Sequence, residues 1–276
     1  MISNLTLVTC LITLFVTLLL PVILISVFSF RNKKQKLLSA WVLGAAGFFV
    51  TQMVIRLPIL TVLQSQPWFV SFSVSNGFLY AFTLAFTAGL FELAGRFVVA
   101  KLMAKNLNYK RGLAAGMGHG GIEAMILIGV TYLNNVLYIL MINNGTFDAV
   151  VNDAVAAGVD VSALLLIKDQ LVSASPALFL LAGFERILAM TGHVAMSLLV
   201  CYGVTTGSPW KSALVCLGIH TLMDLTAGIS LLIGKGLSQT AAYLIIYAIL
   251  TATAIASIIV ICNIRRQWNE TEVDYV

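Results

Sequence analysis

Long apolar stretches separated by short polar segments dominate the pattern of this chain of 276 residues. Each of the long stretches approaches or exceeds the roughly twenty residues that a helix needs to cross a bilayer. They predict spans at Asn4–Phe30, Leu37–Leu63, Gly77–Ala100, Gly112–Ile142, Ala177–Tyr202, Ser212–Ile233 and Gln239–Ile264. The pattern therefore predicts an all-α, polytopic transmembrane helix bundle of about seven spans.

Composition agrees with this pattern. Hydrophobic residues make up 60% of the chain and charged residues only 10%, which excludes an ordinary soluble domain. The net charge of +5 comes from basic residues in short loops between the apolar stretches, so it is a membrane-topology signal and not a nucleic-acid surface. The four cysteines lie within apolar stretches without metal-binding spacing, which favours small buried side chains.

The distribution of charge predicts the topology. Basic residues fill the loops at 31–36 and 101–111, whereas the loop from Asn143 to Pro176 is acidic. By the positive-inside rule the N-terminus lies outside and the C-terminus in the cytoplasm, with Lys235 on the outer side. We interpret Arg56, near the outer end of the second span, as a side chain that snorkels to the membrane surface.

The domain organisation predicted is a single integral membrane domain over residues 1–276. Its motif-bearing core covers about 77–233, and residues 265–276 form a polar cytoplasmic tail. The outer loop favours a short amphipathic helix around Val150 to Gly158.

Ionisable residues inside the spans are few and concentrated. A charged group near the bilayer centre costs about 2.5 to 3.5 kcal/mol on insertion scales, so each is a candidate functional residue. They are Glu92, Arg96, His119, Glu123, Glu185, Arg186, His193, His220 and Asp224.

Their spacing and depth indicate a shared layer. Three pairs, Glu92 with Arg96, His119 with Glu123 and His220 with Asp224, are four residues apart and share a helix face. At 1.5 Å per residue, Glu92, His119, Glu123, His193 and His220 lie roughly 12 to 18 Å from the inner ends of their spans. Glu185 lies roughly 27 Å from its inner end and does not fit the layer.

Each pair also has a structural interpretation. Glu92 with Arg96 is typical of an intrahelical ion pair, and His220 with Asp224 of a buried packing hydrogen bond. The glycines around His119 are typical of close helix packing in membranes, and Glu185 with Arg186 of a structural charge near the outer surface. The shared layer on four helices favours the functional interpretation of the group as a whole.

Such a layer can activate a water molecule, through a carboxylate base or through a metal that lowers the pKa of water. A hydrolase follows from that chemistry. A zinc site needs three His or carboxylate ligands and an open position, although the chain lacks the HExxH pattern of soluble zinc proteases. The alternatives are a proton-coupled transporter that uses the same residues as a relay and a non-catalytic scaffold.

Four segments hold the ionisable residues of the spans: FELAGR at 91–96, GHGGIEAMILIG at 118–129, ERILAMTGHVAMSLLVCYG at 185–203 and HTLMD at 220–224. In this order they resemble the motifs of the PrsW and CAAX-protease/bacteriocin-processing superfamily, and within it the YhfC-type intramembrane metalloproteases. The resemblance covers about Phe91 to Asp224. It implies an intramembrane peptidase in a bacterial cell membrane, acting on a membrane-associated peptide or protein.

The resemblance also implies roles for individual residues. Glu92 corresponds to the glutamate assigned as the base, with Arg96 as its basic partner, and Glu123 to a position that holds water or metal. His193 falls in the third motif, and His220 with Asp224 in the motif thought to stabilise the oxyanion. The second acidic residue of the first motif is absent, since Phe91 stands there, and His119 is additional.

We therefore expect the catalytic residues Glu92, Arg96, Glu123, His193, His220 and Asp224. Candidate metal ligands are His119, Glu123, His193 and His220. Two mechanisms remain open, one with zinc and one that uses glutamate without a metal, and either Glu92 or Glu123 is the base. The expected cavity opens toward the cytoplasm.

Overall fold

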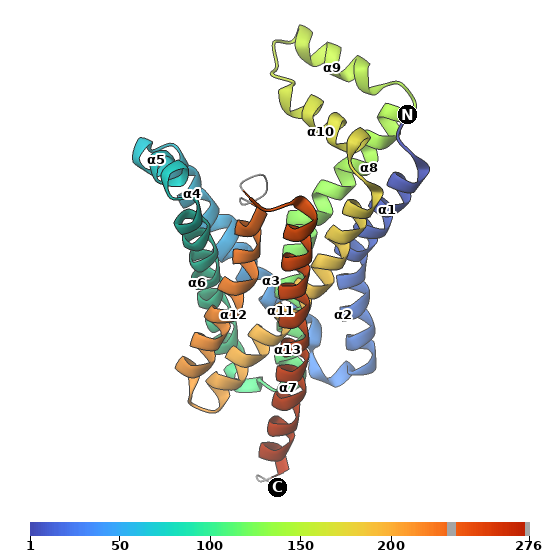
Figure 1. Ribbon diagram of the computed structural model, residues 1–276. Helices are drawn as coiled ribbons and strands as arrows, with labels where there is room; N and C mark the ends of the chain where they lie inside the picture. Colours follow the sequence, from blue (N-terminus) through green and yellow to red (C-terminus); the bar gives the residue numbers. More distant parts are fainter. Residues whose placement is uncertain (231–235, 274–276) are drawn as a thin grey trace. The chain divides into compact units, whose positions relative to one another are not determined.

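A computed structural model of the protein describes residues 1–230 and 236–273 (Figure 1). The described chain is helical without strands, and it contains seven helices long and apolar enough to cross a membrane. The predicted all-α bundle of seven spans is thereby confirmed, and the chain is an integral membrane protein. The direction of the spans stays a prediction. Some of the sequence predictions lie outside the described residues: the position of Lys235, the end of the sixth span at Ile233, and the tail residues 274–276.

Three of the spans are built from consecutive helices with a π-helical segment inside them. The first span contains α1 (Asn4–Leu14), η1 (Phe15–Leu19) and α2 (Leu20–Arg31). The second span contains α3 (Leu37–Phe48), η3 (Phe49–Arg56) and α4 (Leu57–Gln64). The fourth span contains α7 (Tyr109–Glu123), η5 (Ala124–Gly129) and α8 (Val130–Asn143). The others are α6 (Gly77–Met103), which η4 (Ala104–Asn106) extends, α11 (Pro176–Thr205), α12 (Pro209–Ile229) and α13 (Gln239–Val273).

Shorter helices occupy the connections. The helix expected around Val150 to Gly158 is confirmed as α9 (Phe147–Ala156). Three further helices were not expected: η2 (Lys33–Gln35), α5 (Pro67–Ser75) and α10 (Ser162–Ser173). Proline at the first position of α5 suits a helix start, because its missing N–H would be unpaired there in any case.

The chain forms two compact units, each with its own core. The first comprises residues 1–20 and 124–187, and the second residues 21–123 and 188–276. In the first unit, Cys10, Tyr132, Ile139 and Phe179 belong to one apolar cluster. There the Asn143 amide pairs with the backbone of Ile2, accepting from its N–H at 2.6 Å and donating to its carbonyl at 3.0 Å. The single-domain organisation stays a prediction.

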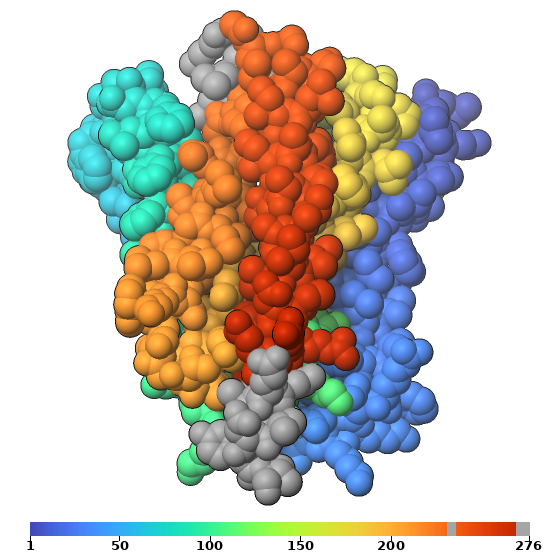
Figure 2. All heavy atoms as spheres, turned by 60° about the horizontal axis from the view of Figure 1, so that its bottom comes forward, coloured from blue at the N-terminus to red at the C-terminus, as the bar shows by residue number. Residues whose placement is uncertain are grey.

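In the second unit, α3 packs against α6 and α7, and α12 packs against α6 and α13 (Figure 1). Figure 2 shows α13 running along the surface of this unit beside α12. Its outward side chains, such as Leu244 and Ile255, are exposed and apolar, as expected of a helix in contact with lipid.

Glycine lets these helices approach closely. A Cβ built on Gly44 of α3 would lie 1.9 Å from the Ala115 carbonyl oxygen of α7, and one on Gly118 of α7 would lie 1.9 Å from the Trp41 carbonyl oxygen of α3. Between α7 and α11, a Cβ on Gly116 would lie 2.7 Å from the Val194 Cα. Small residues at helix interfaces are the usual means of tight packing in membranes.

Helix α6 shows how polar groups are sorted in this unit. Leu90 and Val98 are exposed on its outer side, whereas Glu92 and Arg96 are buried on its inner side. Polar groups therefore face the interior of the unit and apolar groups face outward, which is the arrangement that lowers the cost of charge in a membrane.

The contact at Gly44 yields a stability prediction. Gly44→Ala should lower the free energy of unfolding by about 1 to 3 kcal/mol, because the new methyl group would overlap backbone atoms that cannot rotate away. Gly218→Ala on α12 is the matched control, since no atom lies within 4 Å of its added Cβ. Thermal unfolding of both variants in detergent measures the effect. Equal stability of the two variants would contradict the close packing of α3 on α7.

Candidate functional site

The side chains singled out in the sequence converge on Glu92 of α6. Its Oε2 atom lies 2.7 Å from His220 Nε2 on α12 and 2.9 Å from His119 Nε2 on α7. Arg96, one turn along the same helix, donates to the same oxygen at 3.1 Å. Glu92 is only 3% exposed, so this oxygen is held among buried donors.

The other carboxylate oxygen has a partner that the sequence did not reveal. Gln52 donates from Nε2 to Glu92 Oε1 at 2.8 Å and to the Ala88 carbonyl at 3.2 Å. Gln52 lies on η3 and is 4% exposed. π-Helical segments inside α-helices occur frequently at functional sites. Gln52 is uncharged, so a search for ionisable residues passes over it, although a buried amide also needs a hydrogen-bond partner, and that need is the signal that could have found it.

Arg56 supports Gln52, and our interpretation of Arg56 as a snorkelling side chain is wrong. Its guanidinium donates to Gln52 Oε1 at 3.2 Å and to the Leu84 carbonyl at 2.6 Å. The side chain is turned toward α6 because buried acceptors are available there. A chain of hydrogen bonds thus runs from Arg56 through Gln52 to Glu92.

His193 of α11 connects Arg96 with Glu123. Its Nδ1 atom lies 2.6 Å from Arg96 Nη2, and its Nε2 atom lies 2.8 Å from Glu123 Oε2. Because a guanidinium only donates, Nδ1 must accept in this contact, and a neutral imidazole then carries its proton on Nε2. Arg96 therefore sets the tautomer of His193, and the Glu123 carboxylate lies beside the protonated nitrogen.

The three imidazole rings lie next to one another. His193 stacks on His119 with 5.5 Å between ring centroids and meets His220 edge-on at 5.4 Å. Glycines leave space for them: a Cβ on Gly120 would lie 2.8 Å from the Cβ of His193, and one on Gly89 would lie 3.3 Å from that of His220. The glycines around His119 thus serve the packing of histidines as well as of helices.

The predicted pairs have different outcomes. Glu92 and Arg96 form the expected intrahelical ion pair. His119 and Glu123 share a helix but contact different partners, Glu92 and His193. Asp224 Oδ2 lies 3.4 Å from His220 Nδ1, and its side chain is 39% exposed.

Glu185 belongs to the first unit, where it pairs with the neighbouring Arg186. The histidines all belong to the second unit.

Three of these residues form a group that could hold a metal ion. Ligand atoms of Glu92, His119 and His193 lie within 4.8 Å of one another, and all three residues are buried. Two imidazoles and one carboxylate are a known ligand set of catalytic zinc in proteases, so the donor set fits a metal of that kind. Of the four ligand candidates from the sequence, His119 and His193 belong to this group, and Glu92 joins them.

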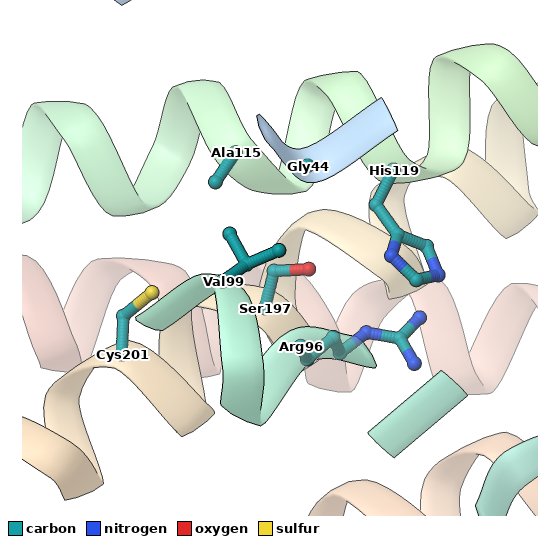
Figure 3. A pocket seen from close by; sticks show the side chains of 7 residues that line it. All are labelled: Gly44, Arg96, Val99, Ala115, His119, Ser197 and Cys201. Carbon is teal, nitrogen blue, oxygen red and sulfur yellow. The ribbon is translucent and has the colours of Figure 1, made fainter. Parts of the chain in front are cut away.

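A small cavity of about 10 Å³ adjoins the group, with room for about one water molecule (Figure 3). Arg96, His119 and Ser197 line it, together with small residues of α3 and α7. Arg96 Nε and Nη1 and Ser197 Oγ are buried and make no hydrogen bond within the part of the chain that the structure describes. The site thus combines a metal-binding donor set with a polar space of water size.

Comparison with known proteins finds a family and a relative that match most of the chain. The sequence model of a family described as YhfC intramembrane metalloprotease matches residues 16–250. The chain is 29% identical over 229 residues to a Bacillus subtilis (strain 168) protein described as uncharacterized membrane protein YhfC; the match covers 82% of this chain and 85% of that one. No solved structure matches.

The hydrogen bond from Gln52 gives a second stability prediction. Gln52→Met keeps the volume of the side chain but removes both the donor to Glu92 and the acceptor for Arg56. The free energy of unfolding should fall by about 1.5 to 3 kcal/mol, because buried charged groups lose their partners. Gln64→Met, at an exposed position of the same span, is the control. Chemical or thermal unfolding in detergent measures both, and an unchanged Gln52→Met protein would refute the role given to this hydrogen bond.

Proposed function

Because the chain belongs to the YhfC intramembrane metalloprotease family, we propose that it is an intramembrane peptidase that hydrolyses a peptide bond at or within the membrane. The observation that carries this proposal is the buried group of Glu92, His119 and His193 on three different spans. The natural substrate class is a membrane-associated peptide or protein. We place the enzyme in a bacterial cytoplasmic membrane, with a site that opens toward the cytoplasm.

Glu92, His119 and His193 are the proposed metal ligands, and Nδ1 of His193 would bind the metal in place of its contact with Arg96. A metal bound there would polarise the scissile carbonyl and lower the pKa of its bound water. Gln52 and Arg96 hold the Glu92 carboxylate in place, and the Glu123 carboxylate lies 2.8 Å from Nε2 of His193. Such outer partners of metal ligands typically change metal affinity 10- to 100-fold when they are mutated.

Glu123 is the proposed base. Its side chain is 12% exposed, against 4% for that of Glu92, so an attacking water reaches it more readily. In the proposed reaction Glu123 accepts a proton from the attacking water and later passes it to the leaving amine. His220 and Asp224, whose side chains lie 3.4 Å apart, are assigned to the oxyanion, which Nε2 of His220 would reach by exchanging its contact with Glu92.

This assignment predicts a loss of hydrolysis in Glu123→Gln. Removing a general base should lower kcat by roughly 10²- to 10⁴-fold, while the folded protein and its metal are retained. Glu185→Gln, in the other unit, is the matched control and should keep its activity. Cleavage of a membrane-peptide substrate by the reconstituted full chain measures both variants.

Two results would count against the assignment. Full activity in Glu123→Gln with loss of activity in Glu92→Gln would transfer the role of base to Glu92. Movement of protons or solute into liposomes without any cleaved product would replace the peptidase by the transporter alternative.

Metal content gives an independent prediction. Purified protein should hold about one metal ion per chain, and Glu92→Gln, His119→Ala and His193→Ala should each lose most of it. His220→Ala and Glu123→Gln should retain it. Elemental analysis of the folded variants checks this set. A metal-free protein that still cleaves its substrate after chelation would support the glutamate mechanism without a metal.

A further inference from the structure

A second polar cavity lies in the second unit, away from the histidines. It has a volume of about 410 Å³, within the range of small-ligand sites. It lies between the loop that joins α2 to α3 and the loop that joins α6 to α7, where four span ends meet. The polar residues that line it are Lys34, Gln35, Lys36, Asn106, Asn108 and Arg111.

The charge of this cavity is of one sign. Lys34, Lys36 and Arg111 are cationic, and neither loop, at 31–36 or at 101–111, contains an aspartate or glutamate. The other polar side chains are amides, which can donate hydrogen bonds. The lining therefore suits an anion with several acceptor oxygens.

Hydrogen bonds between the two loops give the cavity a defined shape. Asn108 donates from Nδ2 to Gln35 Oε1 at 2.8 Å. Arg111 donates from Nη1 to the carbonyls of Gln35 and Lys36, each at 3.3 Å. Arg111 Nε is buried and makes no hydrogen bond to the described part of the chain.

Two helices begin beside the cavity. Helix α3 starts at Leu37, and Lys36 before it has a left-handed backbone (φ 49°) and provides no side-chain cap. Helix α7 starts at Tyr109, directly after Asn108, which accepts from the Arg111 N–H at 3.0 Å. Helix N-termini carry partial positive charge, and they add to the field of the three cations.

We propose that this cavity binds a phosphate group, supplied by the headgroup of an anionic phospholipid. Phosphate offers several acceptor oxygens, which suits both the cations and the free N–H groups of a helix start. Because the loops connect membrane spans, the cavity lies at the bilayer surface, where lipid headgroups are concentrated and basic pockets recruit them. The proposal does not depend on peptidase activity.

Binding of short-chain phosphatidylglycerol to the full chain in phosphatidylcholine nanodiscs tests the site, with glycerol 3-phosphate as the soluble probe. The double variant Lys34→Gln with Lys36→Gln should bind phosphatidylglycerol about 10- to 30-fold more weakly, since both residues line the cavity and each would contribute about a factor of five next to the phosphate. Lys105→Gln with Lys110→Gln is the matched control, because it removes two charges from the neighbouring loop but from residues that do not line the cavity. It should lose less than about 3-fold.

The outcomes separate the explanations. Equal weakening in both double variants would overturn the site in favour of a diffuse attraction of basic loops to anionic lipid. Binding of phosphatidylglycerol no tighter than that of phosphatidylcholine would also overturn it. If glycerol 3-phosphate binds as tightly as the lipid, the phosphate chemistry stands and the lipid source is wrong. An unchanged thermal midpoint in both double variants confirms that folding is intact.

Discussion

The buried carboxylate of Glu92 is the interaction on which the second unit depends. A carboxylate placed inside a membrane protein loses its hydration, and the cost is offset only when charge and hydrogen bonds replace water. Glu92 obtains these from Arg96 on its own helix, from Gln52 on the second span, and from His119 and His220 on the fourth and sixth. Four spans are therefore tied to one side chain, and displacement of any of the other three would remove a partner from a buried charge.

Close helix packing is the condition for this arrangement. Side chains as short as Glu and His can meet at one oxygen only if the helix axes are near, and glycine provides that approach at Gly44, Gly118 and Gly120. In the membrane there is little hydrophobic drive to bring helices together, so van der Waals contact and interhelical hydrogen bonds supply it. The glycines and the polar cluster thus support each other: the glycines allow the contacts, and the contacts hold the helices at that distance.

Helices α3 and α7 take part in both of the polar regions of this unit. Gln52 follows α3 in the second span and His119 lies on α7, and the same two helices begin at the basic cavity. Hydrogen bonds between the loops fix the starts of these helices, while the cluster around Glu92 fixes them deeper in the unit. The alignment of the two helices is therefore held by contacts at two depths, the loops and the Glu92 cluster.

The sequence by itself determined the seven spans and the set of costly residues. Runs of about twenty apolar residues have few alternatives to a membrane helix, and a Glu or His inside such a run stands out because its burial must be compensated. Spacing along one helix also predicted the Glu92–Arg96 ion pair, since residues four apart lie on the same face of a helix.

Only the tertiary structure decided the partners across helices. His119 meets Glu92 and not the glutamate four residues along, and Arg96 reaches His193 as well as Glu92, because rotation of each helix about its axis is set by packing and not by sequence spacing. Gln52 and Arg56 were missed or misread for a related reason. An amide carries no charge and so does not stand out among the ionisable residues, and an arginine near a span end has water within reach in an isolated helix. Both find better acceptors only once α6 lies beside them.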